Sequence, residues 1–309
     1  MTSGEATALQ SPSVVVVGSL NLDIVVPVPH HPSPGETVLG GVSFRNPGGK
    51  GANQAVAVAR LGRPVAMVGS VGDDDAGRAL IASLEREGVD VANVLMRSEV
   101  PSGLALIAVD GKGENSIVVS PGANNSLTTT DVRSTATQLG SADVVLLQLE
   151  IPMEAVAEAA TLTRGIVVLN PAPAAQVPAA VLERVDILVP NRAELATLSG
   201  ADRLESIRDV VAVARALRGP RAVVATLGSD GAVVIQDDRW THVEAPSVKV
   251  VDTTAAGDCF CGALAVALVD DRALEDAARW ATAAAAIATT RPGAQASMPY
   301  RSDLEGATR

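Results

Sequence analysis

Aromatic residues are scarce in this sequence. Of 309 residues, two are Phe, two are Trp and one is Tyr. Proteins that hold single-stranded nucleic acid use aromatic rings as stacking platforms, and all nucleic-acid surfaces need clustered cations. The formal net charge of −11 offers no such excess. We therefore expect no nucleic-acid partner, and a core built from Ala, Val, Leu and Ile.

Cysteine, histidine and long apolar runs are also scarce. The two cysteines, Cys259 and Cys261, are separated by one residue, which would strain a disulfide, and three histidines are too few for an imidazole metal cage. The longest apolar run, Ala263–Val269, is far shorter than the roughly 20 residues of a membrane-spanning helix. Residues 1–13 contain no Lys or Arg and no signal-peptide core. We expect a soluble cytoplasmic protein without a membrane partner.

Short apolar segments alternate with helical ones along most of the chain. Val14–Val17 is wholly apolar and β-branched, which is typical of a strand buried on both faces. The alternation predicts an α/β fold with a mostly parallel, doubly wound sheet flanked by helices, and the length suits one large domain or two smaller ones. The expected strands are 14–17, 65–68, 144–149, 166–169, 187–189 and 223–226, and the expected helices are 52–61, 73–87, 153–163, 192–199, 206–217 and 259–269.

Two insertions interrupt this alternation. Residues 22–46 contain two strand-like runs around a Pro-rich turn, and residues 100–121 contain a hairpin around Asp110–Gly113. We expect them to form a small antiparallel sheet at the mouth of the main sheet. Residues 1–13 and 301–309 are expected to be flexible tails.

Several common motifs are missing. The glycine-rich loop Asn46–Gly51 is no Walker A loop, because Gly51 stands where a Mg²⁺-binding Ser or Thr would be. No Gly-x-Gly-x-x-Gly follows the first strand, which argues against a nicotinamide dehydrogenase. Nucleophile-elbow, zinc-peptidase and Cys-x-x-Cys motifs are also missing, which argues against hydrolases, zincins and thiol redox proteins.

The strongest local signal is the segment Asp252–Asp258, which leads into an apolar helix. Its small residues leave the first amides of the helix open to an anion, which the helix dipole favours. Asp258 lies in the same turn, where a carboxylate could accept a hydroxyl proton as a general base. Alternatively, Asp252 or Thr254 caps the helix and Asp258 only complements its dipole. The segment alone does not separate these interpretations.

Polar residues also follow several predicted strands, at the edge where open α/β sheets bind ligands. Asn21 and Asp23 suit contacts with vicinal hydroxyls, although a surface turn is the simpler explanation for them. Glu150 could simply be solvated. Asn191 and Glu194, one helical turn apart, could hold a hydrated Mg²⁺, but an N-cap Asn with a first-turn Glu is simpler.

Two glycine-rich segments add to this set. Gly48–Asn53 opens the first helix and allows a ligand close to the backbone, or it is a hinge below the small sheet. The turn Thr226–Gly231 could line a nucleotide with its amides, although by itself it is an ordinary hairpin turn.

Together, and in this order, these motifs resemble those of the ribokinase-like carbohydrate kinases. Two signatures carry the resemblance: Gly-Gly-Lys-Gly-Ala-Asn at 48–53 and Asp-Thr-x-Ala-Ala-Gly-Asp at 252–258. The similarity spans about residues 14–300 and implies a single kinase domain over residues 1–309. It implies an enzyme that transfers the γ-phosphoryl group of ATP to the 5-hydroxyl of D-ribose, with Mg²⁺ and a monovalent cation, K⁺, as cofactors.

The resemblance also implies roles for individual residues. Asp258 would be the base, and the amides of Ala255, Ala256 and Gly257 would form the anion hole. The sugar would be bound by Asn21, Asp23, Gly49, Lys50, Asn53, Glu150 and Asp258. The nucleotide would contact Asn191, Thr226, Leu227, Gly228, Ser229, Asp230, Gly231, Gly257 and Thr282, and Glu194 would organise Mg²⁺ and phosphate. The monovalent cation would be held by Asp252, Thr254, Ala288, Arg291, Gly293 and Ser297.

In such kinases the small sheet would be a lid over the sugar, and two lids would pair in a homodimer. Thr282 stands where relatives often carry a larger polar residue, which bears on the adenine contacts. The alternatives are a kinase for another sugar or a nucleoside, or a non-catalytic sugar-binding or regulatory protein of this fold. The shortage of aromatics favours a small hydroxylated sugar over a base-bearing substrate.

Overall fold

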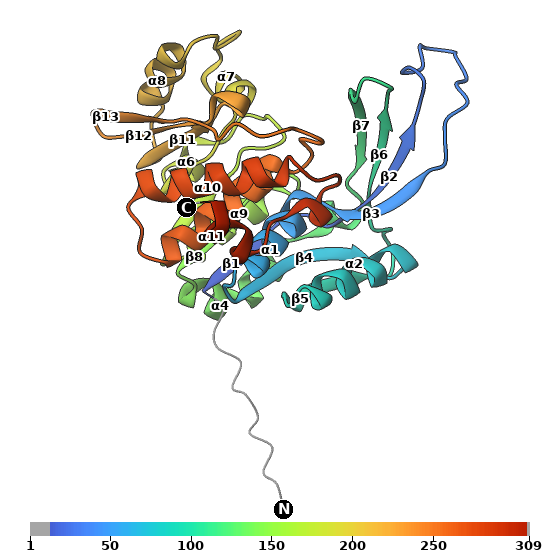
Figure 1. Ribbon diagram of the computed structural model, residues 1–309. Coiled ribbons are helices and arrows are strands. Elements are labelled where there is room, and N and C mark those ends of the chain that lie inside the picture. Colours follow the sequence, from blue (N-terminus) through green and yellow to red (C-terminus); the bar gives the residue numbers. More distant parts are fainter. Residues whose placement is uncertain (1–12, 308–309) are drawn as a thin grey trace, which may run out of the picture.

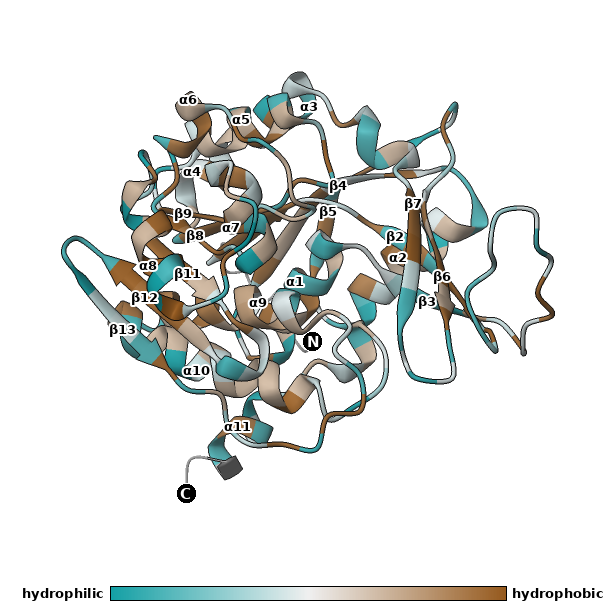
Figure 2. Ribbon diagram, turned by 90° about the horizontal axis from the view of Figure 1, so that it is seen from above, coloured by the Kyte–Doolittle hydropathy of each residue, from teal (hydrophilic) through white to brown (hydrophobic). Residues whose placement is uncertain are grey.

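The computed structural model describes residues 13–307, whose largest part is a nine-stranded sheet between two layers of helices (Figures 1 and 2). Strand β12 runs antiparallel to β11 and β13, and the other neighbours are parallel, so the prediction of a mostly parallel, doubly wound sheet is confirmed. In spatial order the strands are β13 (Arg239–Val243), β12 (Ala232–Gln236), β11 (Ala222–Thr226), β10 (Ile187–Leu188), β9 (Ile166–Leu169), β8 (Val144–Leu147), β1 (Val14–Val17), β4 (Val65–Gly72) and β5 (Asp90–Arg97).

Strand β1 shows why the sheet needs helices on both sides. Its four valines are fully buried, and their side chains alternate between two apolar clusters. Val14 and Val16 join the cluster under α1 (Lys50–Arg60), α2 (Asp75–Arg86), α9 (Ala256–Val269) and α10 (Leu274–Ala288). Val15 and Val17 join the cluster under α3 (Thr129–Ser134), α4 (Ala136–Ser141), α5 (Met153–Leu162), α6 (Ala179–Leu182), α7 (Arg192–Ser199) and α8 (Ile207–Ala216).

Helix α9 is largely buried and lies between α1 and α10. A Cβ on Gly262 would come within 2.6 Å of the Ala57 side chain and 2.9 Å of the Gln54 carbonyl oxygen. Only glycine therefore allows α1 and α9 to pack this closely. The close packing brings the first turns of both helices together.

A second sheet stands beside the body, at the right of Figure 1. Its strands, in the order β3-β2-β6-β7, are Phe44–Gly48, Asn21–Pro27, Gly103–Val109 and Asn115–Ser120. The outer pairs are antiparallel, as expected, whereas the central pair β2–β6 is parallel. The two central strands share a direction because they follow β1 and β5, which both run the same way in the main sheet.

The C-terminal segment differs from the expectation of a flexible tail. Residues Arg301–Ala307 form helix α11, and Arg301 and Asp303 pair with Asp270 and Arg291 at 2.8 and 3.1 Å. These ion pairs attach the helix to the body. Residues 1–12 and 308–309 lie outside the described part of the chain. Between residues 13 and 307, no helix combines the length and apolar character that a bilayer crossing requires.

Candidate active site

The carboxyl edge of the parallel strands gathers the polar residues that the sequence singled out. Asn21 and Asp23 follow β1, Glu150 follows β8 and Asn191 follows β10. Asn191 forms a parallel bridge with Thr226, the last residue of β11. Because parallel strands end at one edge, residues far apart in the sequence lie along one line.

Asp258 is a buried carboxylate held on both oxygens. Its side chain lies in the first turn of α9 and is 5% exposed. Oδ2 accepts a hydrogen bond from Asn53 Nδ2 (2.9 Å), and Oδ1 accepts one from Gln54 Nε2 (3.2 Å). Burial raises the pKa of Asp258, whereas the charge of Lys50 and the two hydrogen bonds oppose that rise. The group is thus a fixed carboxylate with an elevated proton affinity.

The start of α9 has no side-chain cap. Ala255, the N-cap residue, is left-handed (φ 57°), and the Asp252 carboxylate accepts instead from the amides of Thr254 (2.9 Å) and Gly293 (2.8 Å). The interpretation that Asp252 or Thr254 caps this helix is therefore wrong. The Ala256 amide donates to the Thr253 carbonyl oxygen (3.2 Å).

Three neighbouring amides stay open. Those of Ala255, Gly257 and Asp258 have no acceptor within residues 13–307. The N-terminus of the helix therefore presents donors and the positive end of its dipole. An anion could bind there.

Asn124 fixes the orientation of the Asn21 side chain. Asn124, in the 3₁₀ helix Gly122–Ser126, donates to Asn21 Oδ1 (2.7 Å) and to the Leu20 carbonyl, and accepts from the Leu20 amide (2.8 Å). Gly103 makes room, since a Cβ there would lie 2.2 Å from Asn21 Oδ1. The side-chain nitrogen of Asn21, Nδ2, is thus left to donate to a ligand.

Asp23 lies beside Asn21 on the same face of β2 and is buried. Burial, followed by repulsion from Glu150 and Asp258, raises its pKa to about 7. A Cβ on Gly48 would lie 2.2 Å from Asp23 Oδ2, so glycine is required there for this carboxylate to lie against β3. The result is a carboxyl that titrates near neutral pH.

Glu150 and Lys50 complete this polar group. One oxygen of Glu150, Oε2, accepts from the Ser19 hydroxyl (2.5 Å) and from the Lys50 amide (3.1 Å). The Lys50 side chain faces Asp258, Glu150 and Glu194. Burial alone would lower the pKa of Lys50, but these carboxylates raise it. A cation thus lies among the carboxylates of this polar group.

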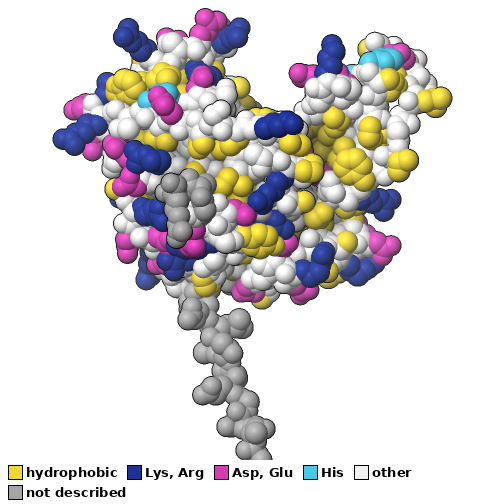
Figure 3. Space-filling model, viewed as in Figure 1, with side chains coloured by type: hydrophobic (Ala, Val, Ile, Leu, Met, Phe, Trp, Pro, Cys, Tyr) yellow, Lys and Arg dark blue, Asp and Glu magenta, His cyan; other side chains and the backbone are white. Residues whose placement is uncertain are grey.

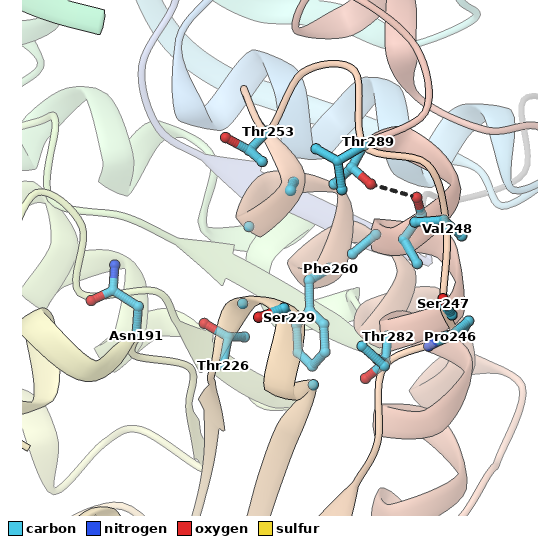
Figure 4. A pocket seen from close by; sticks show the side chains of 18 residues that line it. Asn191, Thr226, Ser229, Pro246, Ser247, Val248, Thr253, Phe260, Thr282 and Thr289 are labelled. Atoms are coloured by element: carbon cyan, nitrogen blue, oxygen red, sulfur yellow. Dashed lines mark hydrogen bonds between the residues drawn. The ribbon is translucent and has the colours of Figure 1, made fainter. Parts of the chain in front are cut away.

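A cavity of about 770 Å³ opens on the other side of the α9 N-terminus (Figure 4). In Figure 4 the Phe260 ring lies between Ser229 and Thr282, with Thr226 beside Ser229 and Asn191 farther to the left of the cavity. Its size is within the usual range for a small-molecule site. Seven of the residues predicted to contact a nucleotide line it: Asn191, Thr226, Gly228, Ser229, Gly231, Gly257 and Thr282.

Two predicted nucleotide residues do not line this cavity. Leu227 is 7% exposed and packs in the core, and the Asp230 carboxylate pairs with Arg192 at 3.0 Å. From the turn Thr226–Gly231, two glycines, Ser229 and Thr226 line the cavity, and the glycines suit contacts through the backbone.

Asn191 and Glu194 form a reciprocal capping box at the start of α7. Asn191 Oδ1 accepts from the Glu194 amide (2.9 Å), while the two Glu194 oxygens accept from the Asn191 amide (2.8 Å) and Nδ2 (2.7 Å). Burial, partly opposed by the Asn191 hydrogen bond and Lys50, raises the pKa of Glu194. The capping role considered from the sequence is thus confirmed. Within residues 13–307, no cluster of three His, Cys, Asp or Glu side chains forms a metal cage.

The segments predicted to hold a monovalent cation lie against each other. The amides of Val251 and Asp252 donate to the Thr289 carbonyl (2.8 and 3.1 Å), and the Gly293 amide reaches Asp252. Burial would raise the pKa of Asp252, but hydrogen bonds from Thr254 and Gly293 outweigh it and lower the pKa. Carbonyl and carboxylate oxygens of this kind suit a hard cation.

The other predicted cation ligands are already engaged. The Ala288 carbonyl accepts from the Arg291 amide, the Arg291 side chain pairs with Asp303, and the Ser297 hydroxyl donates to the Ala294 carbonyl. The backbone carbonyl oxygens of Ala288, Arg291 and Ser297 each still have a lone pair that an ion could use.

Four residues of the site were not predicted from the sequence: Ser19, Gln54, Asn124 and Phe260. Gln54 directly follows Asn53 in the glycine-rich signature, so its place there was the available signal. Asn124 gave no signal, because its partner Asn21 is more than a hundred positions away.

Most of the chain is similar to known kinases. Residues 11–301 match the model of the pfkB family carbohydrate kinases. A ribokinase of Haemophilus influenzae is 38% identical over 296 residues, covering 94% of this chain and 96% of the relative. A deoxyribokinase of Salmonella typhi is 36% identical, covering 93% and 95%.

Solved structures agree in fold as well as in sequence. The ribokinase of Thermotoga maritima aligns with a TM-score of 0.87 and 39% identity, covering 96% of this chain and 98% of that one. The ribokinase of Arabidopsis thaliana, solved with ribose and ATP, aligns with a TM-score of 0.85 and 34% identity, covering 96% and 98%. The chain therefore belongs to the pfkB family of carbohydrate kinases.

Proposed function

We propose that this carbohydrate kinase transfers the γ-phosphoryl group of ATP to the 5-hydroxyl of D-ribose. The observation that carries the proposal is the position of Asp258. Its carboxylate borders the polar group of Asn21, Asp23 and Glu150, while the adjoining Ala256 and Gly257 line the 770 Å³ cavity. A sugar on one side and a nucleotide on the other would meet at this carboxylate. The relatives named as ribokinases support this substrate pair.

Phosphoryl transfer depends on positioning and on charge stabilisation rather than on a covalent nucleophile. Asp258 would accept the proton of the sugar hydroxyl as that oxygen attacks phosphorus. The open amides of Gly257 and its neighbours would stabilise the charge on the transferring group, as in other anion holes. Asn21, Asp23 and Glu150 would hold the other hydroxyls of the sugar.

Two cations belong to this proposal. Mg²⁺ would neutralise phosphate charge, with Glu194 holding it through water, because both Glu194 oxygens already accept hydrogen bonds from Asn191. K⁺ would lie at the junction of segments 252–254 and 288–297, where it would order the start of α9 without touching the substrate.

The second sheet would act as a lid and as the contact of a homodimer. On β2, Leu22 and Ile24 lie on the face opposite to Asn21 and Asp23, in register with Leu104 and Leu106 of β6. Leu106 and its β7 neighbour Val118 are 48% and 65% exposed. Figure 3 shows apolar side chains gathered on this part of the surface. A second copy of the chain in the cytoplasm would cover them.

The relative named as a deoxyribokinase makes deoxyribose the second candidate substrate. The test is ATP consumption with ribose, deoxyribose, fructose and adenosine in turn, each with K⁺ or Na⁺. We expect the highest kcat/KM with ribose. A higher value with deoxyribose would replace the proposed substrate, and no sugar-dependent turnover would favour a binding protein.

A further inference from the structure

Two buried glutamines lie behind Asp258. Gln54, on α1, and Gln148, directly after β8, are both 0% exposed. Gln148 Nε2 donates to Gln54 Oε1 at 2.6 Å, and Gln54 Nε2 donates to Asp258 Oδ1 at 3.2 Å. The three side chains therefore form one chain of hydrogen bonds that crosses from the sheet, through α1, to the carboxylate on α9.

The chemistry of these groups sets the direction of the chain. An ionised carboxylate only accepts, so Gln54 must turn its NH₂ group toward Asp258 and its carbonyl oxygen toward Gln148. Gln148 must then offer its own NH₂ group. Turning either amide over would set two oxygens, or two NH₂ groups, against each other. Gln148 thus restrains Gln54 in the orientation that donates to Asp258.

The protein gives up packing and hydrogen bonding for this arrangement. A Cβ on Gly18 would lie 1.9 Å from Gln148 Oε1, so the glycine at this position makes room for the Gln148 side chain. Gln148 Oε1 has no partner within residues 13–307. A buried polar atom without a partner is unfavourable, whereas an apolar pair of the same shape could be nearly neutral.

We propose that Gln54 and Gln148 are positioning residues that keep Asp258 ionised and correctly oriented for proton abstraction. The inference rests on the proposed role of Asp258 as the base. Neither glutamine touches the substrate in this scheme: Gln54 acts on Asp258, and Gln148 acts on Gln54. Without the Gln54 donor the ionised carboxylate is less favourable, so Asp258 takes up a proton at higher pH and stops acting as a base.

Other charges around Asp258 stay in place when a glutamine is replaced. Lys50 favours its ionised form, and repulsion from the neighbouring carboxylates opposes it. Burial raises the pKa of both α9 thiols, which therefore remain neutral. The groups that face Asp258 are Lys50 from α1, Asp23 from β2, Glu150 after β8, Glu194 from α7, and Cys259 and Cys261 from α9.

The test is the pH profile of kcat and of KM for ribose in Gln54→Met and Gln148→Met, which remove the amide at similar side-chain volume. The control is Gln138→Met, which breaks another amide pair, Asn93 Nδ2 to Gln138 Oε1 (2.7 Å), in helix α4, which contributes no residue to the site. We expect Gln54→Met to lose about tenfold in kcat at the acid end of the profile, the effect of one hydrogen bond to a charged group, and little at the alkaline end. Gln148→Met should lose less, with KM unchanged in both.

A uniform fall of kcat at every pH, or profiles that coincide with the control, would overturn the inference. A second measurement separates it from the proposed function: NMR titration of the Asp258 carboxyl carbon in the unliganded protein. Titration at higher pH in both variants than in the wild type supports the inference even if ribose is not the substrate. Unchanged titration overturns it even if ribose is phosphorylated. If Gln54→Met does not fold, Gln148→Met decides in both measurements.

Discussion

Replacing Asp258 by Asn separates catalysis from stability at this site. The change removes the negative charge and the proton-accepting capacity, while the shape of the side chain is kept. We expect kcat with ribose to fall by about 10²–10⁴-fold, the usual contribution of a general base.

The hydrogen bonds around residue 258 allow the change. Asp258 accepts from Asn53 Nδ2 and Gln54 Nε2, and an Asn would present one acceptor and one donor. Asn53 Oδ1 is buried and has no partner within residues 13–307, so Asn53 can turn its amide over and accept from the new NH₂ group. The number of hydrogen bonds is then conserved, and the free energy of unfolding should fall by no more than about 1 kcal/mol.

The pH dependence of this stability has a definite sign. Because the pKa of Asp258 is raised on folding, the folded state binds the proton more tightly than the unfolded chain does. The ionised carboxylate therefore opposes folding once the pH rises above the ordinary pKa of an aspartate. Asp258→Asn removes that penalty. Its melting temperature relative to wild type should therefore be higher at pH 7 than at pH 3, where the carboxyl is protonated in both states.

Asp270→Asn, at the other end of α9, is the matched control. Hydrogen bonds from Arg63 and Arg301 outweigh burial and lower the pKa of Asp270, so its loss should reduce stability and leave kcat unchanged. The assays are coupled ATP consumption and thermal melting. Turnover of Asp258→Asn within tenfold of wild type would refute the role of Asp258 as the general base. A loss of several kcal/mol in the free energy of unfolding would refute the hydrogen-bond argument.

Three further changes test the rest of the site. Asp23→Asn should raise the melting temperature at pH 8 but not at pH 4, because a pKa of about 7 against 3.8 makes the ionised carboxylate oppose folding by up to about 4 kcal/mol; equal melting shifts at both pH values would contradict this. In wild type we expect ribose binding, measured by calorimetry, to weaken as pH falls through 7. In Asp23→Asn this pH dependence of ribose binding should be absent. Asp252→Ala should abolish the stimulation of kcat by K⁺ while leaving KM for ribose within about threefold, since the site orders α9 without touching the sugar; retained stimulation would place the cation elsewhere. Leu106→Glu should shift the protein from dimer to monomer in sedimentation, because a charge would be buried at the contact; an unchanged sedimentation coefficient would exclude this face.

The sequence pattern located the layers of the fold well. Val14–Val17 could be recognised because a wholly apolar β-branched run is soluble only when buried on both faces, and the structure buries all four valines. The sequence pattern did not predict strand β5 or the long helix α10. β5 lies at the edge of the sheet with several exposed side chains, so it lacks the wholly apolar run that marks the buried strands.

What the sequence determined by itself is the chemistry available: a carboxylate beside small residues at a helix start, a glycine-rich loop, and polar residues after strands. These are local properties, because the residues concerned are neighbours in the chain. Only the tertiary structure decided which of them meet. Asn53 and Asp258 are joined across more than two hundred residues because Gly262 lets α1 and α9 touch, and Gln148 and Asn124 became part of the site only through such long-range packing.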